Sequence, residues 1–158
     1  MRIFLSLVCL FSSWLSFAQP SEAQLSVWVN EAIVSTYTFD YENYLDQEKK
    51  IAHYFSPKAW ITYSDALTAS KLMDTIQKNK FKASAVATSA PEIKMLSPGQ
   101  WQASMPVLVV YANNDTEQKQ TLKVLIVFKE VSPPQGVRGL QIQSYQSKVE
   151  IPSCSCNK

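Results

Sequence analysis

The period of the hydrophobic pattern changes once along this chain, near Phe81, and this change limits the possible folds more than any other feature. Before it, the spacing i, i+3, i+4, i+7 of an amphipathic helix is followed by Leu25, Trp28, Val29 and Ala32. After it, apolar and polar residues alternate with a period of two, as in strands with one buried face. Helices followed by strands indicate an α+β fold in which helices cover one face of an antiparallel sheet.

Helix start signals divide the first half of the chain into three or four predicted helices. Ser21 is suited to cap the first helix, and Ser56 with Pro57 supplies an N-cap and a first helical residue for the third. The predicted helices span residues 22–38, 45–55, 57–70 and 72–80. Trp28 is expected on the face of the first helix that packs under the sheet. The aromatic-rich segment 37–44 interrupts the helical pattern.

The second half predicts four strands of a strongly bent sheet. The first begins at Phe81 and is interrupted or bent at Ala90-Pro91, and the others span residues 100–112, 122–131 and 137–148. Residues 122–131 are the most apolar and are expected to be central. The segment Asn113-Asn114-Asp115 has the side chains of a hairpin turn.

Pro106 carries a separate prediction about the strand 100–112. Proline cannot donate a backbone hydrogen bond, so Pro106 predicts that this strand lies at a sheet edge or contains a bulge. Because sheet edges recruit partners, this strand is the expected contact region. Leu108 is the residue to test there if its side chain is exposed.

Residues 1–18 have the pattern of a secretory signal. Arg2 precedes an apolar run, and Ser16-Phe17-Ala18 fits a signal-peptidase site, so cleavage between Ala18 and Gln19 is expected. The run is shorter than the ~20 residues of a spanning helix; a retained anchor is the alternative. The predicted division is therefore a signal over 1–18, one domain over 19–150 and a cysteine-containing tail over 151–158.

Removal of the signal would leave two cysteines, Cys154 and Cys156, both in the tail. An even number of cysteines suits an oxidising compartment, and a possible disulfide joins these two. A bridge across one intervening residue closes a very small ring with strained geometry. A redox pair, an intermolecular bridge, half of a metal site and two free thiols on a terminal tail remain open.

The scarcity of two residue types excludes several classes of site. Glycine occurs three times and histidine once in the 158 residues. Phosphate-cradling loops and dinucleotide fingerprints need clustered glycines before a helix, and multi-histidine metal sites need several histidines. The chain without Arg2 is nearly neutral, so no general affinity for nucleic acid or anionic membranes is expected. No cofactor and no metal site are therefore predicted.

Few side chains suggest chemistry on their own. Asp40 lies among aromatic residues, where burial could make it a base, but a cap at the break between two helices is the simpler interpretation. His53 falls at a predicted helix end, where a histidine is favoured by the helix dipole. Lys78, Lys80 and Lys82 could form a basic patch, or they are helix-end cations beside a solvent-facing strand.

An ordered set of motifs runs along almost the whole exported part of the chain. The motifs are Trp28-x3-Ala32-x4-Tyr37-x-Phe39-Asp40-Tyr41-x-Asn43-Tyr44, Tyr54-Phe55-Ser56-Pro57-x2-Trp60, Ala66-Leu67-x2-Ser70, Ala85-Val86-Ala87-Thr88-x-Ala90-Pro91, Met105-Pro106-x-Leu108-Val109-x-Tyr111 and Arg138-Gly139-x2-Ile142. In this order and spacing they resemble the IcmL/DotI family of type IVB secretion systems and related conjugation proteins. The structural positions of the resemblance are Trp28, Asp40, Tyr41, Asn43, Tyr44, Phe55, Trp60 and Pro106.

The resemblance implies a nuclear-transport-factor-like (cystatin-like) roll, with N-terminal helices packed on a bent four-stranded antiparallel sheet. It also implies a periplasmic protein without enzymatic activity, cofactor or catalytic residues. Such a protein acts in secretion-apparatus assembly through contacts with other proteins or with itself. Family members commonly carry a cytoplasmic segment and a membrane-spanning helix where this chain has a short signal. A stand-alone accessory paralogue is therefore as well supported as a component of the secretion core.

A function of another class remains open at the level of sequence. Rolls of this kind often enclose a pocket between sheet and helices, which suits a small-molecule binding or isomerase-type protein. An acidic base deep in that pocket would favour this alternative. A pocket filled by aromatic side chains, or exposed flat apolar patches, would favour assembly.

Overall fold

Four helices and six strands make up residues 19–150, the part of the chain that the computed structural model describes. The helices are α1 (Glu22–Ser35), α2 (Tyr44–Ala52), α3 (Pro57–Ser70) and α4 (Leu72–Asn79). The strands are β1 (Phe39–Asp40), β2 (Lys82–Ala87), β3 (Glu92–Ser97), β4 (Gln100–Ala112), β5 (Glu117–Glu130) and β6 (Leu140–Val149). Helices precede strands except for the two-residue β1, so the predicted α+β class is confirmed.

Both predicted helix starts are confirmed by their hydrogen bonds. The Gln24 backbone N–H donates to the Ser21 hydroxyl and the Ser21 N–H donates to the Gln24 side chain, which is a capping box. At α3, the Ala59 N–H donates to the Ser56 hydroxyl, and Pro57 occupies the first helical position, where no N–H is needed. Local side chains therefore decide where these two helices begin.

The helix ends are decided by longer-range contacts and differ from the prediction. The first helix ends at Ser35, not near residue 38, because the chain turns there to form β1. The second ends at Ala52, not at residue 55, because the following backbone binds β6. Ile142 N–H donates to the Tyr54 carbonyl at 2.7 Å, and Ser56 N–H donates to the Ile142 carbonyl at 2.8 Å.

The sheet has six antiparallel strands, not the four expected from sequence. Its order is β1-β2-β4-β5-β6, and β3 pairs with β4 on the same side as β2. The segment around Ala90-Pro91 divides the predicted first strand into β2 and β3, which lie end to end along the long strand β4. β5 lies between β4 and β6, so its predicted central position is confirmed.

The edge or bulge predicted from Pro106 is wrong. β4 is paired on both sides, and its register with β5 runs unbroken through Pro106 opposite Lys123. The Pro106 carbonyl accepts from Thr88 N–H at 3.0 Å, so the backbone polar groups of Pro106 face the side of β2 and β3. Pairing on that side stops at Ala87 and resumes at Glu92. The missing proline N–H therefore falls in a gap between two partner strands and disrupts no ladder.

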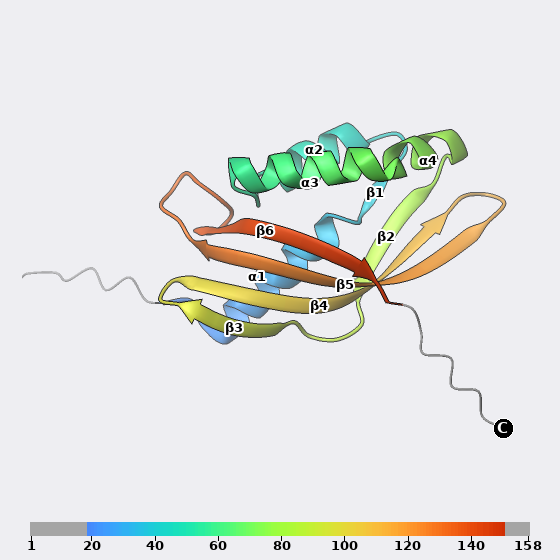
Figure 1. Ribbon diagram of the computed structural model, residues 1–158. Helices are drawn as coiled ribbons and strands as arrows, with labels where there is room; N and C mark the ends of the chain where they lie inside the picture. Colours follow the sequence, from blue (N-terminus) through green and yellow to red (C-terminus); the bar gives the residue numbers. More distant parts are fainter. Residues whose placement is uncertain (1–18, 151–158) are drawn as a thin grey trace, which may run out of the picture.

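All four helices lie on one face of the curved sheet, here called the inner face (Figure 1). α1 contacts β2, β3 and β4, and α3 contacts β6. Trp28, on α1, is 1% exposed, stacks on Phe128 at 5.1 Å between ring centroids, and donates from Nε1 to the Val137 carbonyl at 2.9 Å. The predicted packing of Trp28 under the sheet is confirmed.

The loop between β5 and β6 delays the start of the last strand from residue 137 to Leu140. Val137 and Leu140 bridge each other in a tight turn, and Arg138 forms an ion pair with Glu31 on α1. Gly136 has a φ of 66°, and a Cβ there would lie 2.2 Å from the Leu140 carbonyl oxygen. Glycine is therefore required at this position, which holds the turn against α1.

Candidate functional site

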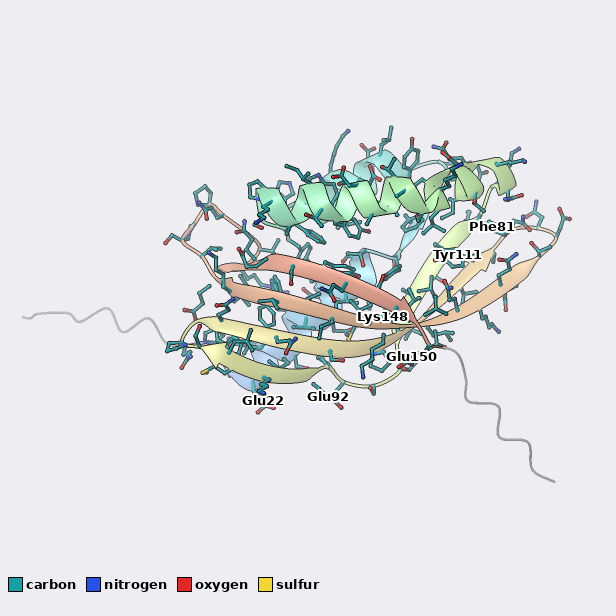
Figure 2. All side chains as sticks on the ribbon, in the orientation of Figure 1. Glu22, Phe81, Glu92, Tyr111, Lys148 and Glu150 are labelled. Atoms are coloured by element: carbon teal, nitrogen blue, oxygen red, sulfur yellow. The ribbon has the colours of Figure 1, made fainter. Side chains whose placement is uncertain are left out.

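A cleft of about 590 Å³ opens between α3 and the inner face of the sheet. Four tyrosines, each from a different element, line it: Tyr37 follows α1, Tyr63 lies on α3, Tyr111 on β4 and Tyr145 on β6. The term tyrosine cleft is used below for this site. Figure 2 places Tyr111 at the end of the sheet below α4, with Lys148 of β6 nearby.

Local periodicity positions the walls of the tyrosine cleft. On α3, a spacing of three to four residues brings one helix face to the cleft, formed by Thr62, Tyr63, Ala66, Leu67 and Ser70. On the strands, alternation directs Tyr111, Leu122 and Tyr145 to the inner face. Between Val127 and Phe128 of β5, the facing strand β6 has one extra residue, Gln143, which forms a bulge. Because of this bulge, both Ile142 and Tyr145 of β6 point to the inner face.

The hydroxyl groups inside the tyrosine cleft bind each other. Thr36 is 1% exposed and donates to the Ile33 carbonyl at 2.7 Å, and its hydroxyl lies 2.6 Å from that of Tyr145. Because the single Thr36 hydroxyl proton is already donated, Tyr145 is the donor to Thr36. The Tyr63 hydroxyl lies 3.4 Å from the Thr36 carbonyl, to which it donates. Thr36 therefore joins α1, α3 and β6.

Burial keeps these tyrosines protonated. Desolvation raises the pKa of Tyr111 to about 12, and the neighbouring Tyr37 adds to the rise. Desolvation also raises the pKa values of Tyr63 and Tyr145 well above the ordinary value for tyrosine. For Tyr37, burial raises the pKa while the side chains of Ser147 and Tyr145 oppose that rise. At neutral pH the tyrosine cleft is therefore lined by uncharged phenols.

The tyrosine cleft can offer hydrogen bonds and aromatic surfaces, but its described lining residues include no aspartate, glutamate or histidine. Lys148 is the charged residue among them, but it lies directly opposite Lys123, so its side chain points to the other face of the sheet. A general base that removes a proton from carbon needs a carboxylate or imidazole with a suitable pKa. The arrangement is thus suited to holding a partner or ligand rather than to proton abstraction by these residues.

Asp40 and His53, the two polar side chains considered for chemistry, lie outside the tyrosine cleft. The Asp40 carboxylate accepts from the backbone N–H groups of Glu42 at 2.9 Å and Asn43 at 3.0 Å, and from the Asn43 side chain at 3.1 Å. It therefore stabilises the turn before α2, but it is not the cap of that helix: the N-cap is Asn43, and no side chain makes a capping hydrogen bond there. His53 is the exposed residue at the C-terminal end of α2.

The other motif residues serve packing and turns. Phe55 is 4% exposed and lies with its ring centroid 5.0 Å from that of Tyr63 and 5.5 Å from that of Trp60. Tyr41 donates to the Glu42 carboxylate at 2.9 Å, and Tyr44 begins α2. Lys78, Lys80 and Lys82 are all exposed. Gln19 is exposed, whereas Ala18, Cys154 and Cys156 lie outside the described residues.

Sequence reasoning did not identify the tyrosine cleft as a cluster. Tyr37 and Tyr111 belong to two separate motifs, and nothing in the sequence links them to Tyr63 and Tyr145. One signal was present: Tyr145 is a single aromatic residue among polar ones, in Gln143-Ser144-Tyr145-Gln146-Ser147. A lone large aromatic in a polar strand suggests a contact with another element.

Two features are absent from residues 19–150. Within that range, no helix combines the length and hydrophobicity needed to cross a membrane. In the same range, no group of three histidine, cysteine, aspartate or glutamate side chains is placed to hold a metal ion.

Residues 13–149 match the profile of a protein family described as a type-IV b secretion system, inner-membrane complex component. The comparison with curated proteins finds no match. The family match spans most of the chain, including both walls of the tyrosine cleft.

Solved structures of secretion proteins have the same fold. An IcmL-like type IV secretion system protein from Legionella pneumophila is 55% identical, with 87% of this chain and 99% of that chain covered and a TM-score of 0.82. The periplasmic domain of DotI is 27% identical, with 82% and 96% covered and a TM-score of 0.76. The VirB8 protein of Agrobacterium tumefaciens, 13% identical with 85% and 98% covered, shares the fold at a TM-score of 0.60. These likenesses confirm the nuclear-transport-factor-like roll.

Proposed function

The chain belongs to the DotI/IcmL family of type IVb secretion-system components, and on this premise we propose that it is an exported periplasmic protein that serves the secretion apparatus through contacts with other proteins. The family match over residues 13–149 is the observation that carries the proposal. The signal pattern of residues 1–18 supports export, and the DotI relative is described as a periplasmic domain.

The tyrosine cleft supports a role in binding rather than in catalysis. Its tyrosines stay uncharged at neutral pH, and the hydroxyl groups of Tyr63 and Tyr145 are already hydrogen-bonded within the protein. Both carboxylate oxygens of Asp40 accept hydrogen bonds within its own turn, one from the Glu42 N–H and one from the Asn43 side chain.

Deletion of the gene in its own organism tests the proposal. We expect reduced transfer of a reporter-fused secretion substrate, restored by the complete chain but not by a chain that lacks residues 2–18. Mass spectrometry of the periplasmic fraction should find a mature protein that begins at Gln19. Normal secretion after deletion, or an intact Met1 in the membrane fraction, would contradict the respective part of the proposal.

A small-molecule binding protein is the second candidate, because a cleft of about 590 Å³ has the size of a ligand pocket. The double substitution Tyr111→Phe with Tyr145→Phe tests it, since the variant keeps the aromatic surface and removes two hydroxyl groups. Under the assembly proposal, secretion and partner crosslinking both persist in a variant that remains folded. Loss of secretion with intact crosslinking would favour the small-molecule candidate.

A further inference from the structure

The face of the sheet opposite the helices, here called the outer face, is open in the described part of the chain. Along β4 the side chains that point inward are buried, and those that point outward, including Leu108 and Val110, are only half-buried. Leu125 and Val127 on β5 are also half-buried, and Val86 on β2 is 56% exposed. These five aliphatic side chains come from three neighbouring strands. The solvent-facing side of an antiparallel sheet usually carries polar residues, so their presence there is unusual.

These aliphatic residues lie on either side of a row that carries two lysines. Pro106 on β4 is directly opposite Lys123 on β5, which in turn is directly opposite Lys148 on β6. Two residues along β4 from Pro106, on the same face, is Leu108, which lies opposite Val86 of β2. Two residues along β5 from Lys123, toward the other end of the sheet, is Leu125. Each of these steps is about 7 Å. The term outer strip is used below for Val86, Leu108, Lys123, Leu125 and Lys148.

The two lysines are an unfavourable pair within the protein itself. Like charges directly opposite each other on neighbouring strands are destabilising. Both lysines are exposed, and within residues 19–150 neither belongs to an ion pair. By contrast, Lys119 on the same face is paired with Glu117 at 2.9 Å. A carboxylate supplied from outside would relieve the repulsion between Lys123 and Lys148.

This chain is a poor source of that carboxylate. Glu150 lies two residues after Lys148, but within residues 19–150 it forms no ion pair with Lys123 or Lys148. Residues 1–18 and 151–158 contain no aspartate or glutamate. A second copy that presents the same face would place lysines against lysines. The helical side, residues 22–80, carries six lysines and eight carboxylates, but Glu31 and Asp46 are already in ion pairs, so only a small excess of carboxylates remains.

An anionic membrane is also a poorer match than a protein. Membrane-facing surfaces are typically enriched in tryptophan and tyrosine, but the outer strip contains only aliphatic and lysine side chains. The outer face also carries Glu92 on β3 and Glu117 on β5, which a uniformly anionic surface would repel.

We propose that the outer strip binds an acidic segment of a partner protein, in which carboxylates that meet Lys123 and Lys148 are flanked by aliphatic side chains that meet Leu108 and Leu125. The inference rests on the proposed function and deepens it by naming the contact surface and the chemistry of the partner.

The binding test uses the exported protein as purified from its own cells. The probes are a short peptide with two central glutamates between leucine and valine, the same peptide with glutamine in place of glutamate, and vesicles of phosphatidylglycerol and phosphatidylcholine. Amide chemical shifts of the outer strip report contact. We expect saturable binding of the acidic peptide at Leu108, Lys123 and Leu125, which weakens as salt rises, and about tenfold weaker binding of the glutamine peptide.

Two charge variants with the same change in net charge provide the comparison. Lys123→Glu with Lys148→Glu should weaken binding of the acidic peptide about tenfold or more. Lys50→Glu with Lys58→Glu, on α2 and α3, should leave it unchanged. Equal effects of both variants, binding of vesicles in preference to the peptide, or no shift at the outer strip with any probe would overturn the inference.

A crosslinking test in the cell separates this inference from the proposed function. A photo-crosslinking amino acid is placed at Thr121 on the outer face or at Ile61, which is 61% exposed on α3. Crosslinks from Thr121 to a carboxylate-rich segment, lost in the Lys123→Glu, Lys148→Glu variant, support the inference. Crosslinks to partners from Ile61 alone would leave assembly by protein contacts standing and reject the outer strip as the contact. No crosslinks from either position would count against both.

Discussion

The two faces of the same strands differ in how they use the alternation of side chains. On the inner face, Trp101, Met105 and Val109 of β4 are each at most 3% exposed under α1. On the outer face, their neighbours include Leu108 and Val110, which no described helix covers. The inner face closes a core, whereas the outer face combines aliphatic groups with unpaired lysines. A sheet face that stays apolar without a cover suggests a contact that forms outside this chain.

The largest expected effect is on the inner face. Trp28→Ala should lower the free energy of unfolding by about 3–5 kcal/mol, because it removes a fully buried aromatic ring and leaves a cavity beside Phe128. Val86→Ala on the outer face is the matched control and should cost less than about 0.5 kcal/mol. Urea unfolding of both variants measures the difference. Similar losses in both would remove the distinction between the two faces.

A pair of threonine substitutions compares a buried hydroxyl with a partly exposed one. Thr36→Val removes the acceptor of the Tyr145 hydroxyl and should cost about 1–3 kcal/mol, because a buried donor loses its partner. Thr121→Val on the outer face removes a hydroxyl with access to water and should change stability by less than about 0.5 kcal/mol. If Thr36→Val were as mild as Thr121→Val, the hydrogen bonds of the tyrosine cleft would contribute little.

The free energy of unfolding should fall between pH 10 and 12, because a tyrosine of the inner face is buried. The pKa of Tyr111 is about 12 in the folded protein and 10 in the unfolded chain, so between pH 10 and 12 only the unfolded chain loses the proton. Stability from this group is therefore complete below pH 10 and is lost as pH rises toward 12, by on the order of 1–2 kcal/mol. Urea midpoints at increasing pH measure the fall, and phenolate absorbance should show buried tyrosines ionising late. A single ionisation step near pH 10 would contradict this account.

The smallest expected effect has the opposite sign. Lys148→Glu replaces a repulsive cross-strand pair with an attractive one, so it should raise the free energy of unfolding by about 0.2–1 kcal/mol. The same variant should bind the acidic peptide more weakly. A more stable protein with a poorer contact surface would show that Lys148 is placed for binding rather than for folding. Destabilisation by Lys148→Glu would argue against repulsion between Lys123 and Lys148.

Much of the fold was predictable from local sequence. The helix starts at Ser21 and Ser56, the alternation along β4 and the hairpin turn at Asn113 each depend on neighbouring residues alone. In the turn, the Asn113 side chain accepts from the N–H groups of Asp115 and Thr116 at 2.9 and 2.8 Å. Interactions of this kind act over a few residues, so the sequence contains the whole of their physical cause.

The tertiary structure decided what depends on pairing between distant segments. Pro106 is compatible with a central strand only because β2 and β3 leave a gap beside it. The tyrosine cleft exists only because residues 37, 63, 111 and 145 meet in space, and Lys123 faces Lys148 only in the register of β5 with β6. A shift of one residue in that register would send these side chains to the opposite face. Register is set by the packing of the whole sheet against its helices, and no local pattern encodes it.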